Sequence, residues 1–229
     1  MTTTTPPAET ARRPNRRGEG GRLRADIVRA ATGLLQERGN EDAVTLRAVA
    51  RAAGIAAPSI YAHFPNPAAI VGAVVAETFA ALTATLHASR EEIDDPVQRL
   101  MGQCCAYLRF AEEHPGLYRV LFARAGGIAQ PMAAAPPDRD AGAETAAKNA
   151  VIVEAGTPAF AILVDAIEGC ITSGRSASRD PFLDAIALWS ALHGYIALRA
   201  AAPEFPWPDE SSILDAMVMG QARLRLAPE

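Results

Sequence analysis

The stretch GIAAPSIYAHFPNP, from Gly54 to Pro67, gathers a proline, a serine, a tyrosine and a histidine on about two helical turns. Pro58 suits the first turn of a helix, where a backbone N–H has no partner anyway, so a short helix is predicted to begin at Ala57 or Pro58. Asn66 followed by Pro67 has the pattern of a helix cap and predicts that the next helix begins there. A helix this short and this sharply ended needs a function to explain it.

Two further helices are predicted just before this stretch. Apolar residues spaced three and four apart between Ile27 and Leu35 form one helix face, and Gly39 would end that helix. Thr45 can cap a second helix, and Gly54 supplies the turn after it because glycine adopts left-handed backbone angles without strain. Two short helices joined by a glycine turn, with a longer helix across them, predict a helix-turn-helix.

A helix-turn-helix presents its second short helix to the major groove of DNA, with the N-terminal residues of that helix toward base edges. The charge distribution fits such a contact. Residues 1–66 carry ten arginines against six acidic residues, a net charge of +4, whereas residues 67–229 carry twelve basic against twenty acidic residues, a net charge of −8. A basic small domain joined to an acidic larger one suits a protein that touches phosphate at one end only. A merely solvated charged tail is the alternative interpretation.

From about Ile27 to Ile70 the chain resembles the TetR family of bacterial transcriptional regulators, most closely in TLRAVARAAGIAAPSIYAHFPN. The family's aromatic, any residue, histidine, phenylalanine pattern falls on residues 61–64. The resemblance implies a double-stranded DNA operator as partner, Arg47 at a base or a phosphate, and Phe64 in the core. Tyr61 is either a phosphate contact or a core aromatic. By this resemblance the DNA-binding residues are Thr45, Arg47, Ala57, Pro58, Ser59, Tyr61 and His63.

The chain departs from the family at two positions. Ala56 stands where many members have a serine or threonine cap, and Pro67 stands where many have a phosphate-binding lysine. We therefore expect a weaker grip on the DNA backbone there. An N-terminal arm over residues 1–20, rich in threonine, proline, glycine and arginine, is predicted to be disordered. It either supplies the missing positive charge or is only a solvated tail, and the arginines concerned are Arg12, Arg13, Arg16, Arg17, Arg22 and Arg24.

The rest of the chain is predicted to be helical, so the fold class is all-α. A three-helix DNA-binding domain (21–66) would be followed by a helical ligand-binding and dimerisation domain (67–229). Four times a capping residue precedes a proline and an apolar helical pattern, at Asn66-Pro67, Asp95-Pro96, Thr157-Pro158 and Asp180-Pro181. Residues 124–150 are predicted to form a loop. The predicted helices are 67–90, 96–113, 115–122, 158–173, 181–200 and 211–225.

The segment ALWSALHGY puts Trp189 and His193 four residues apart and therefore on one helix face. With HPGLYRVLF at residues 114–122, it resembles a C-terminal domain class of TetR-like regulators marked by tryptophan, histidine and glycine. By that resemblance the last two helices pair with their symmetry mates in a homodimer, and Gly194 lets helices approach closely. The interface residues would be Leu188, Leu192, Gly194, Ile196, Ile213, Met217 and Leu224.

The resemblance also implies a small-molecule pocket enclosed by the helices after Pro67. Few charged residues interrupt the apolar faces there, which favours an apolar or weakly polar ligand. Plain core packing is the alternative for each apolar candidate, and a structural hydrogen bond to the backbone is the alternative for His193. The candidates are Phe79, Met101, Cys104, Tyr107, Leu108, Phe122, Phe160, Val164, Trp189 and His193.

No catalytic residue, cofactor or metal site is predicted. The four histidines are scattered, and the sequence has no His-Glu-x-x-His or Cys-x-x-Cys spacing, serine elbow or phosphate loop. Cys104 and Cys105 raise redox sensing as an option, but no resolving partner is evident. An odd cysteine count and no apolar leader before residue 20 predict a cytoplasmic protein. The run from Pro67 to Ala88 is long enough to cross a membrane, but Glu77 at its centre favours a buried core helix and no membrane partner.

These features predict a DNA-binding regulator, most simply a repressor released from a palindromic operator by an apolar ligand. A second hypothesis is a DNA-bound protein of the same fold that recruits a protein partner and binds no small molecule. An apolar-ligand carrier or enzyme that has lost DNA binding is disfavoured, because Arg47, Ser59 and Tyr61 are all present.

Overall fold

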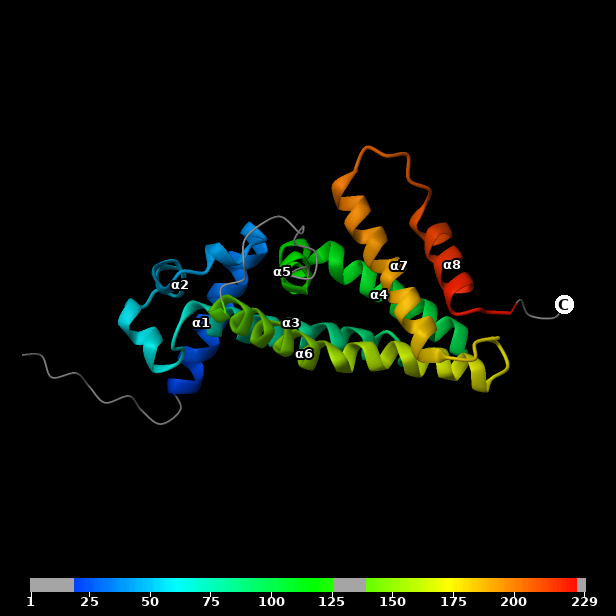
Figure 1. Cartoon of the computed structure of the whole chain (residues 1–229), viewed down its shortest axis with the longest axis horizontal. Coiled ribbons are helices and arrows are strands. Elements are labelled where there is room, and N and C mark those ends of the chain that lie inside the picture. The colour runs from blue at the N-terminus through cyan, green and yellow to red at the C-terminus, as the bar shows by residue number, and fades with distance from the viewer. Residues whose placement is uncertain (1–18, 126–138, 226–229) are drawn as a thin grey trace, which may run out of the picture.

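The computed structural model describes residues 19–125 and 139–225, and within these ranges every regular element is a helix (Figure 1). The predicted all-α fold is confirmed. An N-terminal head, residues 19–66, comprises α1 (Glu19–Arg38), η1 (Glu41–Ala43), α2 (Leu46–Ala53) and η2 (Ala57–Ala62). A pocket domain, residues 67–225, comprises α3 (Pro67–Ala88), α4 (Pro96–Glu113), α5 (Pro115–Ala125), α6 (Arg139–Thr172), α7 (Pro181–Ala201) and α8 (Glu210–Gln221).

The turn between the two short helices of the head forms as its residues predict. The Thr45 side chain accepts a hydrogen bond from the Ala48 N–H at 3.1 Å and caps α2. Gly54 ends α2 at φ +67°, and the Ile55 N–H returns to the Ala50 carbonyl at 2.9 Å, as in a Schellman cap. The next helix is a single 3₁₀ segment, η2, and Ala56 before it has no side-chain oxygen with which to cap it.

Three of the four predicted capped starts are confirmed. Asn66, Asp95 and Asp180 each accept a hydrogen bond from the N–H three residues later, at 2.8, 2.8 and 2.9 Å. The following proline occupies the first helical position in each case. At Asp95 the bond from the Gln98 N–H is the largest of the effects that lower the pKa of the carboxyl group. These local signals fix where α3, α4 and α7 begin.

The predicted start at Thr157-Pro158 is wrong. Pro158 lies inside α6, which begins at Arg139, so residues 139–150 of the predicted loop are helical. Prolines occur only in residues 131–137 of that segment, and the alanine-rich residues beyond them have high helix propensity. Thr157 donates its hydroxyl back to the Val153 carbonyl at 2.6 Å instead of capping a new helix. Residues 126–138 of the predicted loop lie outside the described ranges.

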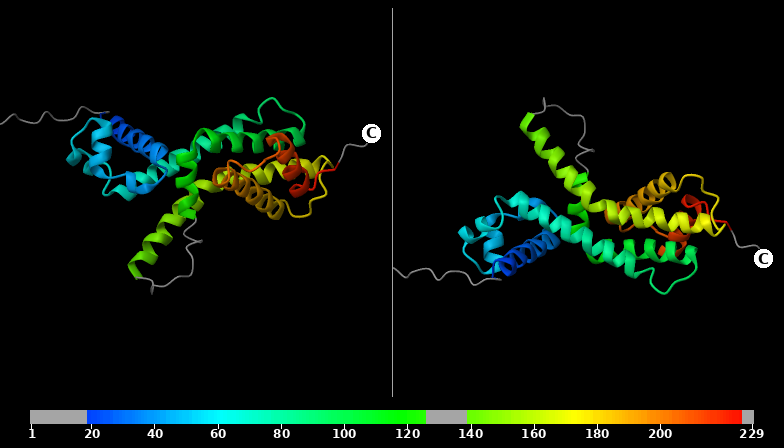
Figure 2. Two further views of the ribbon diagram at one scale, coloured as in Figure 1. Left: turned by 90° about the horizontal axis from the view of Figure 1, so that it is seen from above. Right: turned by 90° about the horizontal axis from the view of Figure 1, so that it is seen from below.

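The molecule is elongated, with the head at one end and α7 and α8 toward the other (Figure 1). Helices α3 and α6 run side by side along its length, and the N-terminal part of α6 projects from the body (Figure 2). Of the arm predicted over residues 1–20, residues 1–18 with Arg12, Arg13, Arg16 and Arg17 lie outside the described ranges, and Glu19 already belongs to α1.

Three helical segments are long and apolar enough in composition to cross a membrane: α3, residues 153–172 of α6, and α7. Within the chain, α3 serves as a core helix. Ile70, Val71 and Val74 are buried toward its head end, and Leu82 and Leu86 are buried farther along. One helix thereby contributes to the core of both the head and the pocket domain.

Candidate nucleic-acid interface and apolar pocket

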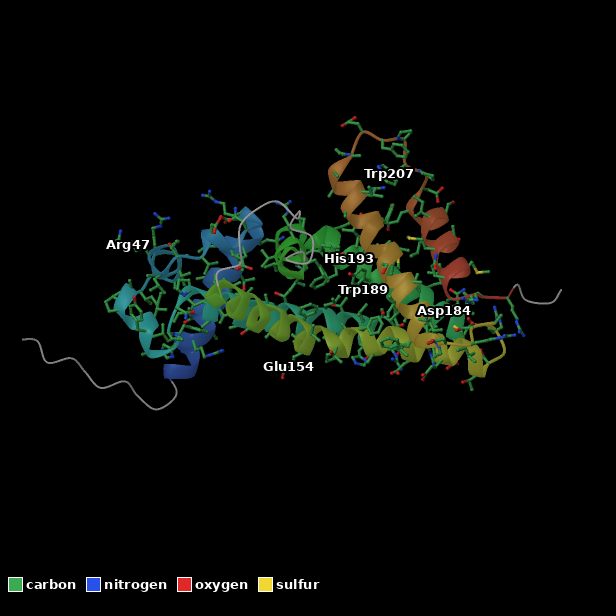
Figure 3. All side chains as sticks on the ribbon, in the orientation of Figure 1. Arg47, Glu154, Asp184, Trp189, His193 and Trp207 are labelled. Atoms are coloured by element: carbon green, nitrogen blue, oxygen red, sulfur yellow. The ribbon has the colours of Figure 1, made fainter. Side chains whose placement is uncertain are left out.

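The residues predicted to touch DNA lie on α2, η2 and their flanks, at the end of the molecule remote from α7 and α8 (Figure 3). Thr45, Arg47, Pro58 and Tyr61 are exposed, whereas Ala57, Ser59 and His63 are half-buried. Tyr61 is 61% exposed, so it is not a core aromatic. The surface therefore offers a guanidinium, a phenol, hydroxyls and an imidazole, the groups that commonly bind phosphate and base edges.

Buried residues hold η2 in place beneath this surface. Ile60 is fully buried and Phe64 is 3% exposed, so the segment is anchored at both sides of Tyr61. The Arg24 guanidinium of α1 lies 4.9 Å from the centroid of the Phe64 ring, a cation–π contact that ties α1 to the end of η2. The short helix is thus rigidly positioned although only its outer face is available.

A cavity of about 520 Å³ lies in the pocket domain, between α3, α4, α5, α6 and α7. Its volume is in the range of small-molecule sites. Six predicted pocket residues line it: Phe79, Cys104, Tyr107, Phe122, Phe160 and Trp189. Sequence reasoning missed the remaining lining residues, which are Leu82, Leu86, Gln103, Val153, Gly156, Thr157, Ala159, Ile162, Leu163, Phe182, Ile186 and Leu192.

Four predicted pocket residues do not belong to the lining. Leu108 is fully buried in the core, and Met101 and Val164 are half-buried against it. His193 lies behind the pocket wall. Which side of an apolar helix such as α6 faces the cavity depends on how the neighbouring helices pack. The periodicity of apolar residues alone therefore does not distinguish cavity-lining residues from core residues.

His193 is the centre of a hydrogen-bonded cluster with Tyr107, Tyr118 and Trp189. Its Nδ1 lies 2.9 Å from the Tyr107 hydroxyl and 2.5 Å from that of Tyr118, and the Trp189 N–H donates to the Tyr107 hydroxyl at 3.3 Å. Burial lowers the pKa of His193 and raises that of Tyr107 to about 12. These shifts favour the uncharged forms of the cluster. Its hydrogen bonds join α4, α5 and α7 behind the cavity. Figure 3 shows Trp189 and His193 together on α7.

The cavity wall is apolar, and no charged side chain belongs to its described lining. Five lining residues are exposed to solvent and mark its mouth: Val153 at 68%, Phe182 at 58%, Trp189 and Ile186 at 37% each, and Thr157. Cys104 lies in the wall, where burial raises the pKa of its thiol to about 12, so the reactive thiolate is suppressed. This chemistry suits an uncharged apolar ligand and disfavours redox sensing at Cys104.

Two helices connect the cavity with the head. Helix α3 follows η2 after residues 63–66 and carries Phe79 into the cavity wall. Helix α5 carries Phe122 into the wall, and its first turn packs on the end of α1. There the Gln36 side chain donates to the Glu113 carbonyl at 3.2 Å and accepts from the Leu117 N–H at 3.3 Å. Both wall helices are therefore in direct contact with α1 of the head.

Gly116 makes the junction between α5 and α1 possible. A Cβ atom at this position would lie 2.2 Å from the Gln36 carbonyl oxygen, so any larger residue requires backbone movement. The close approach allows the Gln36 side chain to bond on both sides of His114, to the Glu113 carbonyl and to the Leu117 N–H.

The predicted dimer interface needs correction at two residues. Leu188 and Leu192 are 0% and 2% exposed, so they pack inside the subunit, and Leu192 lines the cavity. Helix α7 is apolar on nearly every side, and its sequence therefore does not reveal which side faces a partner. The exposed apolar residues include Leu183 and Leu198. Of the other predicted interface residues, those half-buried are Gly194, Ile196, Ile213, Met217 and Leu224.

Two family models match the chain. The model described as "Bacterial regulatory proteins, tetR family" matches residues 27–74, which include the whole turn region of the head. The model described as "Tetracyclin repressor-like, C-terminal domain" matches residues 100–220, more than half of the chain. The chain belongs to the TetR family of transcriptional regulators. The assignment to the tryptophan–histidine–glycine class of TetR-family C-terminal domains stays a prediction.

The chain is also similar to curated proteins over part of its length. The chain is 26% identical over 112 residues to the nucleoid occlusion factor SlmA of Aliivibrio fischeri strain MJ11, a match that covers 49% of this chain and 54% of that protein. The chain thus spans about half the length of the curated relatives it matches.

Two solved structures share the fold. A protein of unknown function from Rhodococcus sp. RHA1 superimposes with a TM-score of 0.68 at 24% identity, covering 88% of this chain and 94% of that one. The fatty acid degradation regulator FadR of Bacillus halodurans gives a TM-score of 0.65 at 16% identity, over 88% and 97% of the two chains. At these identities the likeness establishes the fold of the TetR-family chain.

Proposed function

We propose that this TetR-family regulator is a homodimeric repressor that leaves a palindromic operator when an uncharged apolar molecule fills the cavity. The observation that carries the proposal is the pairing of an exposed, polar η2 surface with a separate apolar cavity in one continuous helical chain. No catalytic function is proposed, because this family consists of DNA-binding regulators. The protein acts in the cytoplasm, where its DNA target is located.

Two copies would present their η2 helices to successive major grooves about 34–36 Å apart on one face of the duplex. The dimer is proposed to form through α7 and α8. Gly194 favours such contact, since a Cβ atom there would meet nothing within 4 Å and a partner helix has room to approach. Exposed Leu183 and Leu198 supply apolar area on the same helix.

Release would follow from a change in the spacing of the two heads. A ligand that spreads the cavity wall moves α3 or α5, and both helices pack on α1. Coupling of this kind is typically worth about 1–3 kcal/mol, which corresponds to roughly 5- to 150-fold in operator affinity. Only a ligand that prefers the spread state shifts the equilibrium.

The match to nucleoid occlusion factors supports a second candidate, a DNA-bound protein that recruits a protein partner and needs no small molecule. The two candidates differ in what the cavity does. The first candidate is favoured because the cavity is open to solvent at Val153 and Phe182 instead of being filled by side chains.

Selection of bound fragments from a random DNA pool tests the DNA-binding part of the proposal. We expect sites with two-fold symmetry, and we expect Arg47→Ala to change the preference at one or two base pairs in each half. Selected fragments without symmetry would contradict the proposal. A metabolite library tested for release of the selected fragment then separates the ligand-responsive regulator from the partner-recruiting one.

A further inference from the structure

Gln103 is a polar residue in an otherwise apolar cavity wall. It belongs to the cavity lining on α4, and its side chain is 3% exposed. Neither its Oε1 nor its Nε2 has a hydrogen-bond partner among the described residues. Buried amides are almost always bonded, so an amide with both ends free inside a binding cavity is unusual.

The hydroxyl and indole groups of the lining are already engaged. The Thr157 hydroxyl donates to the Val153 carbonyl at 2.6 Å, and the Tyr107 hydroxyl is within hydrogen-bond distance of Tyr118 and His193. The Trp189 N–H donates to Tyr107. Cys104 adds only a thiol, which is a weak donor and acceptor, so Gln103 is the described lining residue that offers a ligand both a strong donor and a strong acceptor.

The charge of the lining restricts that ligand. No Lys, Arg, Asp or Glu lies in the described lining to neutralise an ion. Transfer of an uncompensated carboxylate or ammonium from water into such surroundings is strongly unfavourable. A carboxamide matches both ends of the Gln103 amide in one planar group and stays neutral, because its C=O accepts from Nε2 and its N–H donates to Oε1.

The remaining lining restricts the body of the ligand. Six aromatic side chains contribute to the wall, and several meet edge to face: Phe160 and Trp189 at 6.0 Å between centroids, Phe79 and Phe122 at 6.2 Å. Aromatic rings pack favourably in such offset and edge-on arrangements, so an inserted flat ring finds ring faces and edges on several sides. The aromatic lining residues are Phe79, Tyr107, Phe122, Phe160, Phe182 and Trp189.

We infer that the cavity binds a neutral aromatic carboxamide, with the ring between the aromatic side chains and the carboxamide paired with Gln103. This inference rests on the proposed ligand binding and adds the chemical class of the ligand. It makes Gln103 the specificity-determining residue, because the carboxamide supplies the partners that this side chain otherwise lacks.

Calorimetric titration of the full chain with 2-naphthamide, 2-naphthoate and 2-methylnaphthalene tests the inference, because the three probes share one ring system and differ in the attached group. We expect 2-naphthamide to bind most tightly, by roughly 10-fold or more over 2-methylnaphthalene. In Gln103→Met, which keeps the side-chain volume, that preference should disappear. Leu86→Met, also in the wall, is the matched control and should retain it.

Tighter binding of 2-naphthoate or 2-methylnaphthalene by the unaltered protein, an equal preference in Gln103→Met, or no binding of any probe would overturn the inference. None of these results would affect the proposed function if a different small molecule released the selected DNA. Failure of every ligand to release DNA, together with tight carboxamide binding, would instead contradict the proposed function and leave the inference standing. Gln103→Met should also raise the melting temperature of the empty protein, because the orphaned amide is removed.

Discussion

The N-terminal head and the pocket domain are both helical, but different contacts hold their functional parts in place. In the head, the chain turns on either side of η2 are set by residues close in sequence: Thr45 caps α2, Gly54 turns the chain, and Asn66 caps α3. In the pocket domain, the wall comes from helices far apart in sequence, with Phe79 and Trp189 more than 100 residues from each other. The conformation of the turns in the head should therefore tolerate substitutions elsewhere in the chain, whereas the shape of the cavity depends on how whole helices pack.

The largest expected effect comes from separating the two copies of the head. Gly194→Arg should produce monomers without disturbing the subunit, because a Cβ atom there meets nothing within 4 Å. Loss of the second head should lower operator affinity by about 10²- to 10⁴-fold, since the second contact is no longer intramolecular. Sedimentation and DNA titration measure both changes. Gly33→Arg on α1, also with open space around it, is the control that should remain dimeric.

The next effect concerns the junction between head and pocket domain. Gly116→Ala places a methyl group 2.2 Å from the Gln36 carbonyl oxygen, so α5 must withdraw from α1. We expect a loss of about 1–3 kcal/mol in the free energy of unfolding, which urea titration measures. Gly33→Ala should instead stabilise by up to about 1 kcal/mol through helix propensity. Equal stability of the two variants would show that the junction is loosely packed.

A smaller effect is expected within the head. Tyr61→Ala should weaken binding to every DNA sequence alike, by up to roughly 10-fold, because a phosphate contact carries no base information. Tyr61→Phe removes only the hydroxyl, and we expect it to lose most of the DNA affinity that Tyr61→Ala loses. A change in the selected base sequence would mean that Tyr61 reads bases, contrary to its proposed role.

The smallest effect is a pH dependence of the pocket domain. Burial lowers the pKa of His193, so the unfolded chain binds a proton there more readily than the folded chain. The contribution of His193 to stability is full above the unfolded pKa of about 6.5 and is lost as the pH falls below it. Melting temperatures measured between pH 7.5 and 5.5 should fall less in His193→Gln than in the unaltered protein. Parallel curves would mean that another group titrates.

The contrast between local and long-range contacts also explains which features could be predicted from the sequence. The cap at Thr45 and the left-handed turn at Gly54 depend on residues within a few positions of each other, and both were predictable. Pro58 predicted the start of η2 correctly, but its 3₁₀ form was not predicted. The N-terminal cap signal failed at Thr157-Pro158, because a helix that is already formed can pass through a proline when tertiary packing supports it.

The cavity lining was only partly predictable for a physical reason. The large aromatic residues could be chosen by size, and Phe79, Phe122 and Trp189 do line it. The orientation of an apolar helix is set by its neighbours. The spacing of apolar residues in α7 therefore could not predict that Leu192 is buried on the side that faces the cavity. Gln103 would have been found by asking which polar residue interrupts the apolar face of α4.

The central claim is that the contents of the cavity control DNA binding. A substitution that fills the cavity with a side chain tests this claim without a known ligand. Ala159 lines the cavity on α6, so Ala159→Phe would put a ring into it, whereas Ala81→Phe on the exposed side of α3 would not. Affinity for the selected operator should fall by about 5- to 150-fold in Ala159→Phe and remain unchanged in Ala81→Phe. A folded Ala159→Phe protein that binds the operator as tightly as the unaltered chain would contradict the account.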